Sequence, residues 1–181
     1  MKTIRTLLLI ATAHLGTHCL AQDVSLALQK PLKLSAAERN VKWSRLPVNT
    51  VVGFATGSVR YQLDIPPDAV PQKTWQASAW KNEKVHTQMV IYSKTVLENV
   101  TVVPGDLKDN KGNIIKSENI SVGFVQYVMT DEFKKGCGYR KSADFDSSLV
   151  ADIINTDIQN IDVQKNTTQP VWLTVYIPEQ A

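Results

Sequence analysis

The clearest pattern of apolar and polar positions lies near the end of the sequence, in residues 171–177. In this segment, Val-Trp-Leu-Thr-Val-Tyr-Ile, every second side chain is aliphatic. Such alternation is typical of a β-strand that turns one face toward a core. Pro170 and Pro178 flank the segment, and because proline has no N–H to donate to a ladder, we expect the strand to lie between them. The rest of the chain is expected to be organised around this strand.

Other short segments with alternating or clustered apolar residues predict further strands. They are residues 51–55, 59–65, 85–93, 97–103, 120–129, 149–154 and 161–163. Residues 85–93 carry apolar side chains on both faces, which indicates a central strand, whereas residues 59–65 have one polar face. Turn-forming residues separate the segments, notably at 66–74 and 104–113. Residues 130–148 are polar and long, which is typical of a functional or mobile loop.

One short helix is predicted, near the N-terminus. Ser35 and Glu38 have the spacing of a capping box, in which each side chain bonds the other residue's backbone N–H. A helical turn or two should follow and end before Pro47. Many short strands with little helix indicate an all-β fold, an immunoglobulin-like or jelly-roll-type β-sandwich. The order in which the strands pair is left open.

The first 21 residues have the features of a secretory signal peptide. Lys2 and Arg5 precede an apolar run that is too short to span a bilayer, and small residues favour cleavage after residue 21. Lipidation at Cys19 is the alternative, but His18 stands where a small residue is expected. We therefore expect a secreted or periplasmic protein without a membrane span, in which residues 22–181 form a single domain.

The mature chain is nearly neutral. The sequence has 20 Lys and Arg against 17 Asp and Glu, and loss of two basic residues with the signal leaves 18 against 17. No basic run is present, so a nucleic-acid partner is not expected. Cys137 is the one cysteine left, so no internal disulfide can form and the core must hold by packing.

Neither a catalytic site nor a metal or cofactor site is predicted. A nucleophilic Cys137 would need a histidine base and an orienting group, but only His86 remains and no orienting residue can be placed. One cysteine and one histidine are too few to hold a metal ion. The acidic residues of the long loop lack the ligand spacing of a calcium-binding loop. The role of Cys137 is left open.

Two tryptophans that precede a strong strand are candidates for glycan binding. Trp75 and Trp80 can offer electron-rich faces to the C–H groups of a sugar ring, although packing in the core or at its rim is the commoner role. Tyr139 and Arg140, in the long loop, are the other two candidates.

Glu83 and His86 suggest an acid–base pair at first sight. However, residues three apart on a strand point to opposite faces of the sheet. A structural salt bridge from Glu83 to a nearby Lys or Arg is therefore the expectation.

Six sequence segments in a fixed order point to a known family. They are residues 80–83 (WKNE), 100–102 (VTV), 124–128 (FVQYV), 137–140 (CGYR), 149–153 (LVADI) and 169–178 (QPVWLTVYIP). Together with Asp106, Leu107 and Gly112, they resemble the N-terminal β-sandwich domain of glycoside hydrolase family 123 and related secreted proteins of Bacteroides-like bacteria. The resemblance covers about residues 75–181.

The resemblance implies a catalytic barrel downstream of this domain. In the family, an Asp–Glu pair in that barrel supports substrate-assisted hydrolysis of β-linked N-acetylgalactosamine. Asp131–Glu132 is the one adjacent Asp–Glu pair here, and it falls in a predicted sandwich loop, so the pair is not carried over. The family pattern continues with a further strand, whereas this sequence ends at Ala181. We therefore expect truncation and an unpaired sheet edge that would allow oligomers.

Three functions remain in order of preference. The first is a non-catalytic module that supports a barrel absent from this chain. The second is a stand-alone carbohydrate-binding module of a secreted bacterial protein. The third is an independent enzyme, which is least favoured because a barrel does not fit in this length.

Overall fold

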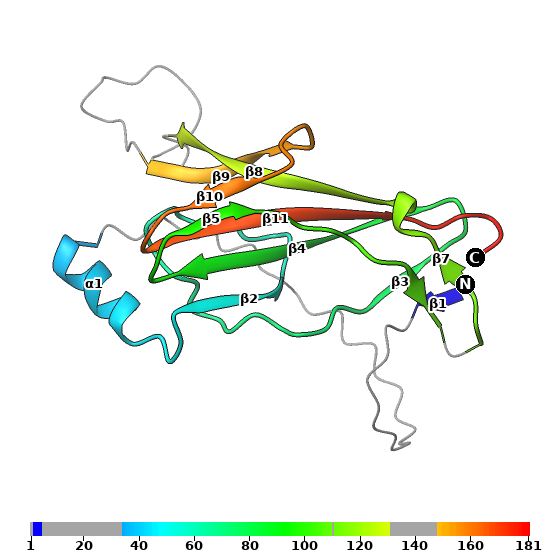
Figure 1. Ribbon diagram of the computed structural model, residues 1–181, viewed down its shortest axis with the longest axis horizontal. Coiled ribbons are helices and arrows are strands. Elements are labelled where there is room, and N and C mark those ends of the chain that lie inside the picture. Colours follow the sequence, from blue (N-terminus) through cyan, green and yellow to red (C-terminus); the bar gives the residue numbers. More distant parts are fainter. Residues whose placement is uncertain (1, 5–33, 110, 131–147) are drawn as a thin grey trace.

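The main element of the structure, a computed structural model that describes residues 2–4, 34–109, 111–130 and 148–181, is a five-stranded antiparallel sheet. Its strands lie in the order β2-β4-β11-β8-β9 (Figure 1). Their bounds are Thr50–Ala55 (β2), Lys84–Ser93 (β4), Thr167–Tyr176 (β11), Ile120–Thr130 (β8) and Ser148–Asn155 (β9). The prediction of a mostly β fold with little helix near the N-terminus is confirmed.

The strand that the alternation of residues 171–177 predicts is confirmed as β11, and it is the middle strand of this sheet. It pairs with β4 from Thr167 to Tyr176, and with β8 from Val171 to Val175. Val171 and Val175 are buried on the face that carries the second layer. β4 lies between β2 and β11, which confirms that residues 85–93 form a central strand.

Pro170 lies inside β11 instead of preceding it, so the expected start of the strand is wrong. Pro170 is buried and stands opposite Val90 of β4. On the other side of β11, the ladder to β8 stops at Val171. Beyond that point, the side-chain amide of Gln169 donates to the carbonyls of Val125 (2.9 Å) and Pro170 (2.8 Å). This amide supplies the donor that proline lacks, so the strand continues past the proline.

Smaller sheets cover one face of the main sheet. β5 (Leu97–Val100) pairs with β10 (Ile161–Val163), and β6 (Leu107–Lys108) pairs with β7 (Ile114–Ile115). β3 (Ala77–Ala79) pairs with β1 (Lys2–Ile4). A 3-10 turn, η1 (Ser117–Asn119), leads into β8. Two apolar clusters join these elements to the main sheet. Their buried members are Ile91, Phe124, Val163 and Val171 in one, and Ala79, Ile115, Val175 and Ile177 in the other.

The opposite face is covered at one end by helix α1 (Ala36–Ser44), on the left in Figure 1. Trp43 of α1 is buried against Val90 and Tyr92 of β4, with the rings of Trp43 and Tyr92 edge to face at 6.5 Å. The indole N–H of Trp43 donates to the carbonyl of Asp64 at 3.0 Å, so burial leaves this polar group satisfied.

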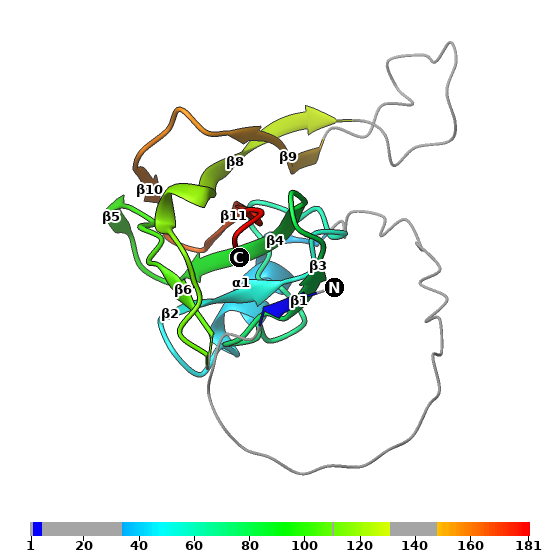
Figure 2. The ribbon, with the colours of Figure 1, turned by 90° about the vertical axis from the view of Figure 1, so that its right-hand side faces the viewer.

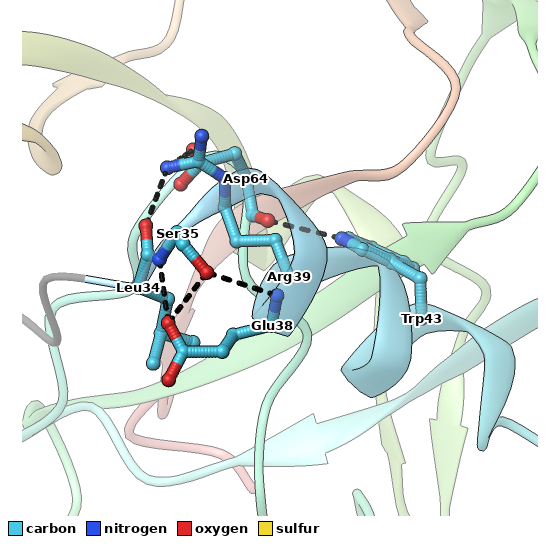
Figure 3. A network of polar contacts seen from close by, with 6 residues as sticks. All are labelled: Leu34, Ser35, Glu38, Arg39, Trp43 and Asp64. Carbon is cyan, nitrogen blue, oxygen red and sulfur yellow. Dashed lines mark hydrogen bonds and ion pairs between the residues drawn. The ribbon is translucent and has the colours of Figure 1, made fainter.

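The predicted capping box is confirmed at the start of α1 (Figure 3). The Ser35 hydroxyl accepts from the Glu38 N–H at 3.3 Å, and the Ser35 N–H donates to the Glu38 carboxylate at 2.7 Å. Arg39 continues the network, because it donates to the Leu34 carbonyl (3.1 Å) and pairs with the Asp64 carboxylate (3.2 Å). The helix ends before Pro47, as expected.

The strand predicted at residues 59–65 is wrong, because this segment forms only an isolated bridge between Gln62 and Val150. The Tyr61 carbonyl accepts from the N–H of Ala151 in β9 at 3.1 Å. Two residues later, the Leu63 carbonyl accepts from the N–H of Thr168 in β11 at 2.8 Å. The segment therefore crosses between two strands that diverge, as Figure 2 shows, and does not run along either of them.

Other expectations are met in part or lie outside the described residues. β5 ends at Val100, which is shorter than the predicted segment 97–103. Most of the expected signal peptide and the long loop at 131–147 are outside the described residues, although Lys2–Ile4 pairs with β3. No helix in the described part of the chain is long and apolar enough to cross a membrane.

Candidate functional site

A cavity of about 510 Å³ lies between the end of β2 and the segment that follows it. Its walls are mainly apolar and proline side chains, with a few polar groups among them. The residues that line it are Phe54, Ala55, Thr56, Val59, Arg60, Tyr61, Gln62, Ile65, Pro66, Pro67, Asp68, Ala69, Val70, Pro71, Gln72 and Val150. Such a concave, mostly apolar pocket is the usual form of a small-molecule site.

Hydrogen bonds from the sheet fix one wall of the cavity. The buried side chain of Gln88 in β4 donates to the carbonyls of Thr56 (3.1 Å) and Val59 (3.2 Å). A side-chain amide that satisfies two carbonyls holds the turn at residues 56–59 in one conformation. Trp172 of β11 stands opposite Gln88, and a Cβ on Gly57 would meet its ring at 3.0 Å, so turn and ring are in close contact.

The charged groups at the cavity are already paired. Asp68 pairs with Lys42 at 2.5 Å, and Arg60 pairs with Asp152 at 3.5 Å. Burial raises the pKa of Tyr61, and the neighbouring Tyr92 raises it further, so the Tyr61 phenol stays neutral. Asp68 is the one carboxylate among the lining residues. Glycoside hydrolysis uses two facing carboxyl groups, so this cavity lacks that arrangement.

Trp80 is an exposed candidate on a well-defined turn. The turn joins β3 to β4, Asn82 has a positive φ of 64°, and the Trp80 side chain is 63% exposed. The Trp80 N–H donates to the Glu83 carboxylate at 2.6 Å, and the Asn82 N–H donates to the Ile177 carbonyl at 2.7 Å. The Glu83 carboxylate therefore bonds a backbone N–H, whereas the sequence predicts a salt bridge to Lys or Arg.

The other predicted site residues are placed differently. Trp75 is partly buried and packs against the apolar cluster that contains Ala79 and Ile177. Tyr139 and Arg140 lie outside the described residues. The structure brings neither Trp75 nor Trp80 into the cavity wall. Their role in glycan binding stays a prediction.

A polar and aromatic group on the main sheet is absent from the sequence prediction. Trp172 of β11 and His86 of β4 lie with ring centroids 5.9 Å apart and ring planes at 34°. His86 Nδ1 and the hydroxyl of Thr174 are 2.9 Å apart. The alternation of residues 171–177 contains the signal, because residues 172 and 174 share the face opposite the aliphatic side chains. Which residues of another strand lie beside them depends on the pairing order.

Comparison with known proteins shows which domain family the chain belongs to. Residues 54–181 match the model of the glycoside hydrolase 123 N-terminal domain, so the chain belongs to this domain family. A similar solved structure is that of a family 123 glycoside hydrolase from Clostridium perfringens, which was analysed for glycolipid glycan hydrolysis. The TM-score is 0.60 at 18% identity, and the match covers 74% of this chain but 22% of the Clostridium chain. No curated protein matches this sequence.

Proposed function

We propose that this chain is a non-catalytic β-sandwich module of a secreted, family 123-type glycoside hydrolase acting on β-linked N-acetylgalactosamine. In this role it supports a catalytic barrel that lies outside the chain. The match of residues 54–181 to the N-terminal domain of the family carries the proposal. The match to 22% of a whole family 123 enzyme supports it, because most of that enzyme has no counterpart here.

The chemistry of the cavity is consistent with a supporting role. Its single lining carboxylate, Asp68, is held in an ion pair with Lys42 and is not opposed by a second acid. A retaining or inverting glycosidase needs one group to protonate the leaving oxygen and a second to assist attack. The residues that line the described cavity therefore do not supply the two groups that hydrolysis needs.

A hydrolysis assay tests the non-catalytic role. The purified protein is incubated with 4-nitrophenyl N-acetyl-β-galactosaminide, with the Clostridium perfringens enzyme as positive control. We expect no nitrophenol release above the buffer rate. Turnover by the wild type that disappears in Asp131→Ala would contradict the proposal, because Asp131–Glu132 is the one adjacent Asp–Glu pair in the sequence.

Glycan binding at the turn between β3 and β4 is a second candidate function. The observation that favours it is the 63% exposure of Trp80, which stands on a turn whose Asn82 N–H bonds the carbonyl of Ile177, the residue after β11. An exposed indole on a fixed turn can stack on a sugar ring. Trp80→Ala should then abolish retention on a glycan affinity gel. Unchanged retention, with the fold intact by circular dichroism, would refute this candidate.

A further inference from the structure

One face of the main sheet is covered at one end and open at the other. α1 packs over Val90 and Tyr92 toward the end of β4, and the segment of residues 61–72 lies beside it. Toward the start of β4, the same face carries Lys84 and His86, both of which are exposed. Because alternate residues share a face, Lys84, His86, Val90 and Tyr92 lie on one side of the sheet. Figure 1 shows α1 at one end of β4 only.

The open part of this face extends across three neighbouring strands. In the register, His86 of β4 stands opposite Thr174 of β11, which stands opposite Ser121 of β8. Trp172 and Tyr176 lie two residues before and two residues after Thr174 on β11, and Tyr176 stands opposite Lys84 of β4. We call this set the open face: Lys84, His86, Ser121, Trp172, Thr174 and Tyr176. Residues directly opposite one another are close enough to act as one surface.

The open face combines the indole ring of Trp172 with groups that form hydrogen bonds. Five of its six residues carry a hydroxyl, imidazole or ammonium group, and none carries a carboxylate. The Lys84 ammonium, the Ser121 hydroxyl and His86 Nε2 have no bond to a described residue, so an aliphatic protein partner would bury these three groups unsatisfied, which is costly. A ligand rich in hydroxyl groups satisfies them, and its C–H groups can pack on the ring of Trp172. The composition therefore favours a sugar over an apolar helix or strand.

The key side chains are already oriented. Thr174 fixes one ring nitrogen of His86 at 2.9 Å, which leaves Nε2 without a bond to any described residue. The Tyr176 hydroxyl donates to the Asn82 side chain at 2.8 Å. Gly57 stands against Trp172, in the turn that Gln88 holds. A surface that is ordered before binding loses less entropy when the ligand arrives.

We propose that the open face binds an oligosaccharide, with one sugar ring packed on Trp172 and hydroxyl groups bonded to His86 Nε2 and Ser121. Three adjacent strands span about 10 Å, which is wider than a single sugar ring, so the ligand is an oligosaccharide and not a monosaccharide. Trp80 is not one of the six residues of the open face, and the proposal does not depend on whether the chain supports a barrel.

Titration of the ¹⁵N-labelled protein with four named probes tests this site. The probes are lactose, N-acetyllactosamine, cellotetraose and methyl N-acetyl-β-galactosaminide, each at millimolar concentration. We expect at least one oligosaccharide to shift the backbone resonances of His86, Trp172 and Thr174. His86→Ala should weaken its binding by about tenfold or more. Val103→Ala is the control: Val103 is 84% exposed and belongs to neither candidate glycan site, so this variant should leave the affinity unchanged.

Three results would overturn the proposal. The first is that none of the four probes shifts the resonances of the open face. The second is that the shifts surround Trp80 and vanish in Trp80→Ala. The third is that His86→Ala binds as tightly as the wild type. Because His86 is exposed, His86→Ala should fold, and its amide spectrum checks this before the titration. If the open face binds no glycan, the result of the hydrolysis assay does not change. The glycan-binding proposal and the proposal of a non-catalytic module can therefore fail separately.

Discussion

At the scale of single residues, Gln169 explains how a proline can lie inside a central strand. Its side chain is buried and bonds two backbone carbonyls, those of Val125 and Pro170. A buried carbonyl without a donor is destabilising, so the side chain does the work of the missing proline N–H. The sequence places Gln169 beside Pro170, but it does not show that Val125, 44 positions away, needs a donor.

Gln169→Leu tests this account with little change in volume. We expect the free energy of unfolding to fall by about 1–3 kcal/mol, because a buried carbonyl loses its donor. Urea denaturation measures the change. Gln126→Leu, at an exposed position on β8, is the matched control and should change stability by less than about 0.5 kcal/mol. Equal losses in both variants would contradict the role given to Gln169.

The cap of α1 gives a pH-dependent prediction. Hydrogen bonds from Ser35, first from its side chain and then from its backbone, lower the pKa of Glu38 below its ordinary value of 4.5. A carboxyl whose pKa is lower in the folded state stabilises the fold above the unfolded value, and the effect is lost as pH falls through the folded value. Ser35→Ala should therefore bring the Glu38 pKa back toward 4.5, which NMR titration measures.

The same variant should cost about 1 kcal/mol of stability at neutral pH, because the helix loses its N-cap. The difference from the wild type should shrink as the solution is acidified below pH 4.5, since the charge-dependent bonds of Glu38 are then lost in both. Ser44→Ala, at the other end of α1, is the control and should leave the Glu38 titration unchanged. A Glu38 pKa that does not move in Ser35→Ala would contradict the capping account.

At the scale of elements, the sequence predicts strands well where side chains alternate along a regular ladder. Residues 85–93, 120–129 and 149–154 appear as β4, β8 and β9. Residues 59–65 alternate too, but their apolar side chains pack against the cavity and core while the backbone crosses between strands. Periodicity reports which side chains are buried, and a crossing segment can bury alternate side chains without a ladder.

Gly53 of β2 gives a prediction for the contact between this strand and the segment after it. A Cβ at residue 53 would lie 2.7 Å from the Pro71 Cβ and 2.8 Å from the Gln72 carbonyl. Gly53→Ala should therefore force the segment away from β2 and lower stability by about 1–3 kcal/mol.

Thermal unfolding measures this change, and amide exchange at Phe54, whose N–H donates to the Gln72 carbonyl at 2.7 Å, should quicken. Gly105→Ala is the control, because an added Cβ there meets nothing within 4 Å. If the two alanine variants were equally stable, the close approach at Gly53 would not exist in solution.

At the scale of the whole molecule, the all-β class and the family could be predicted from the sequence. The match begins at residue 54, so it also takes in the cavity segment that precedes the predicted resemblance. The strand order β2-β4-β11-β8-β9 could not be predicted, because pairing between distant strands depends on the assembled fold. The open face was missed for the same reason, since His86 and Trp172 become neighbours only through that order.

The central claim is that this chain is one module of a larger secreted glycoside hydrolase. The intact mass of the protein isolated from its source organism, under denaturing conditions, tests it most directly. We expect a mass several times the 20.1 kDa of this chain. A mass of about 18 kDa, the value left after removal of a signal peptide, would contradict it and make the sandwich a protein that works alone.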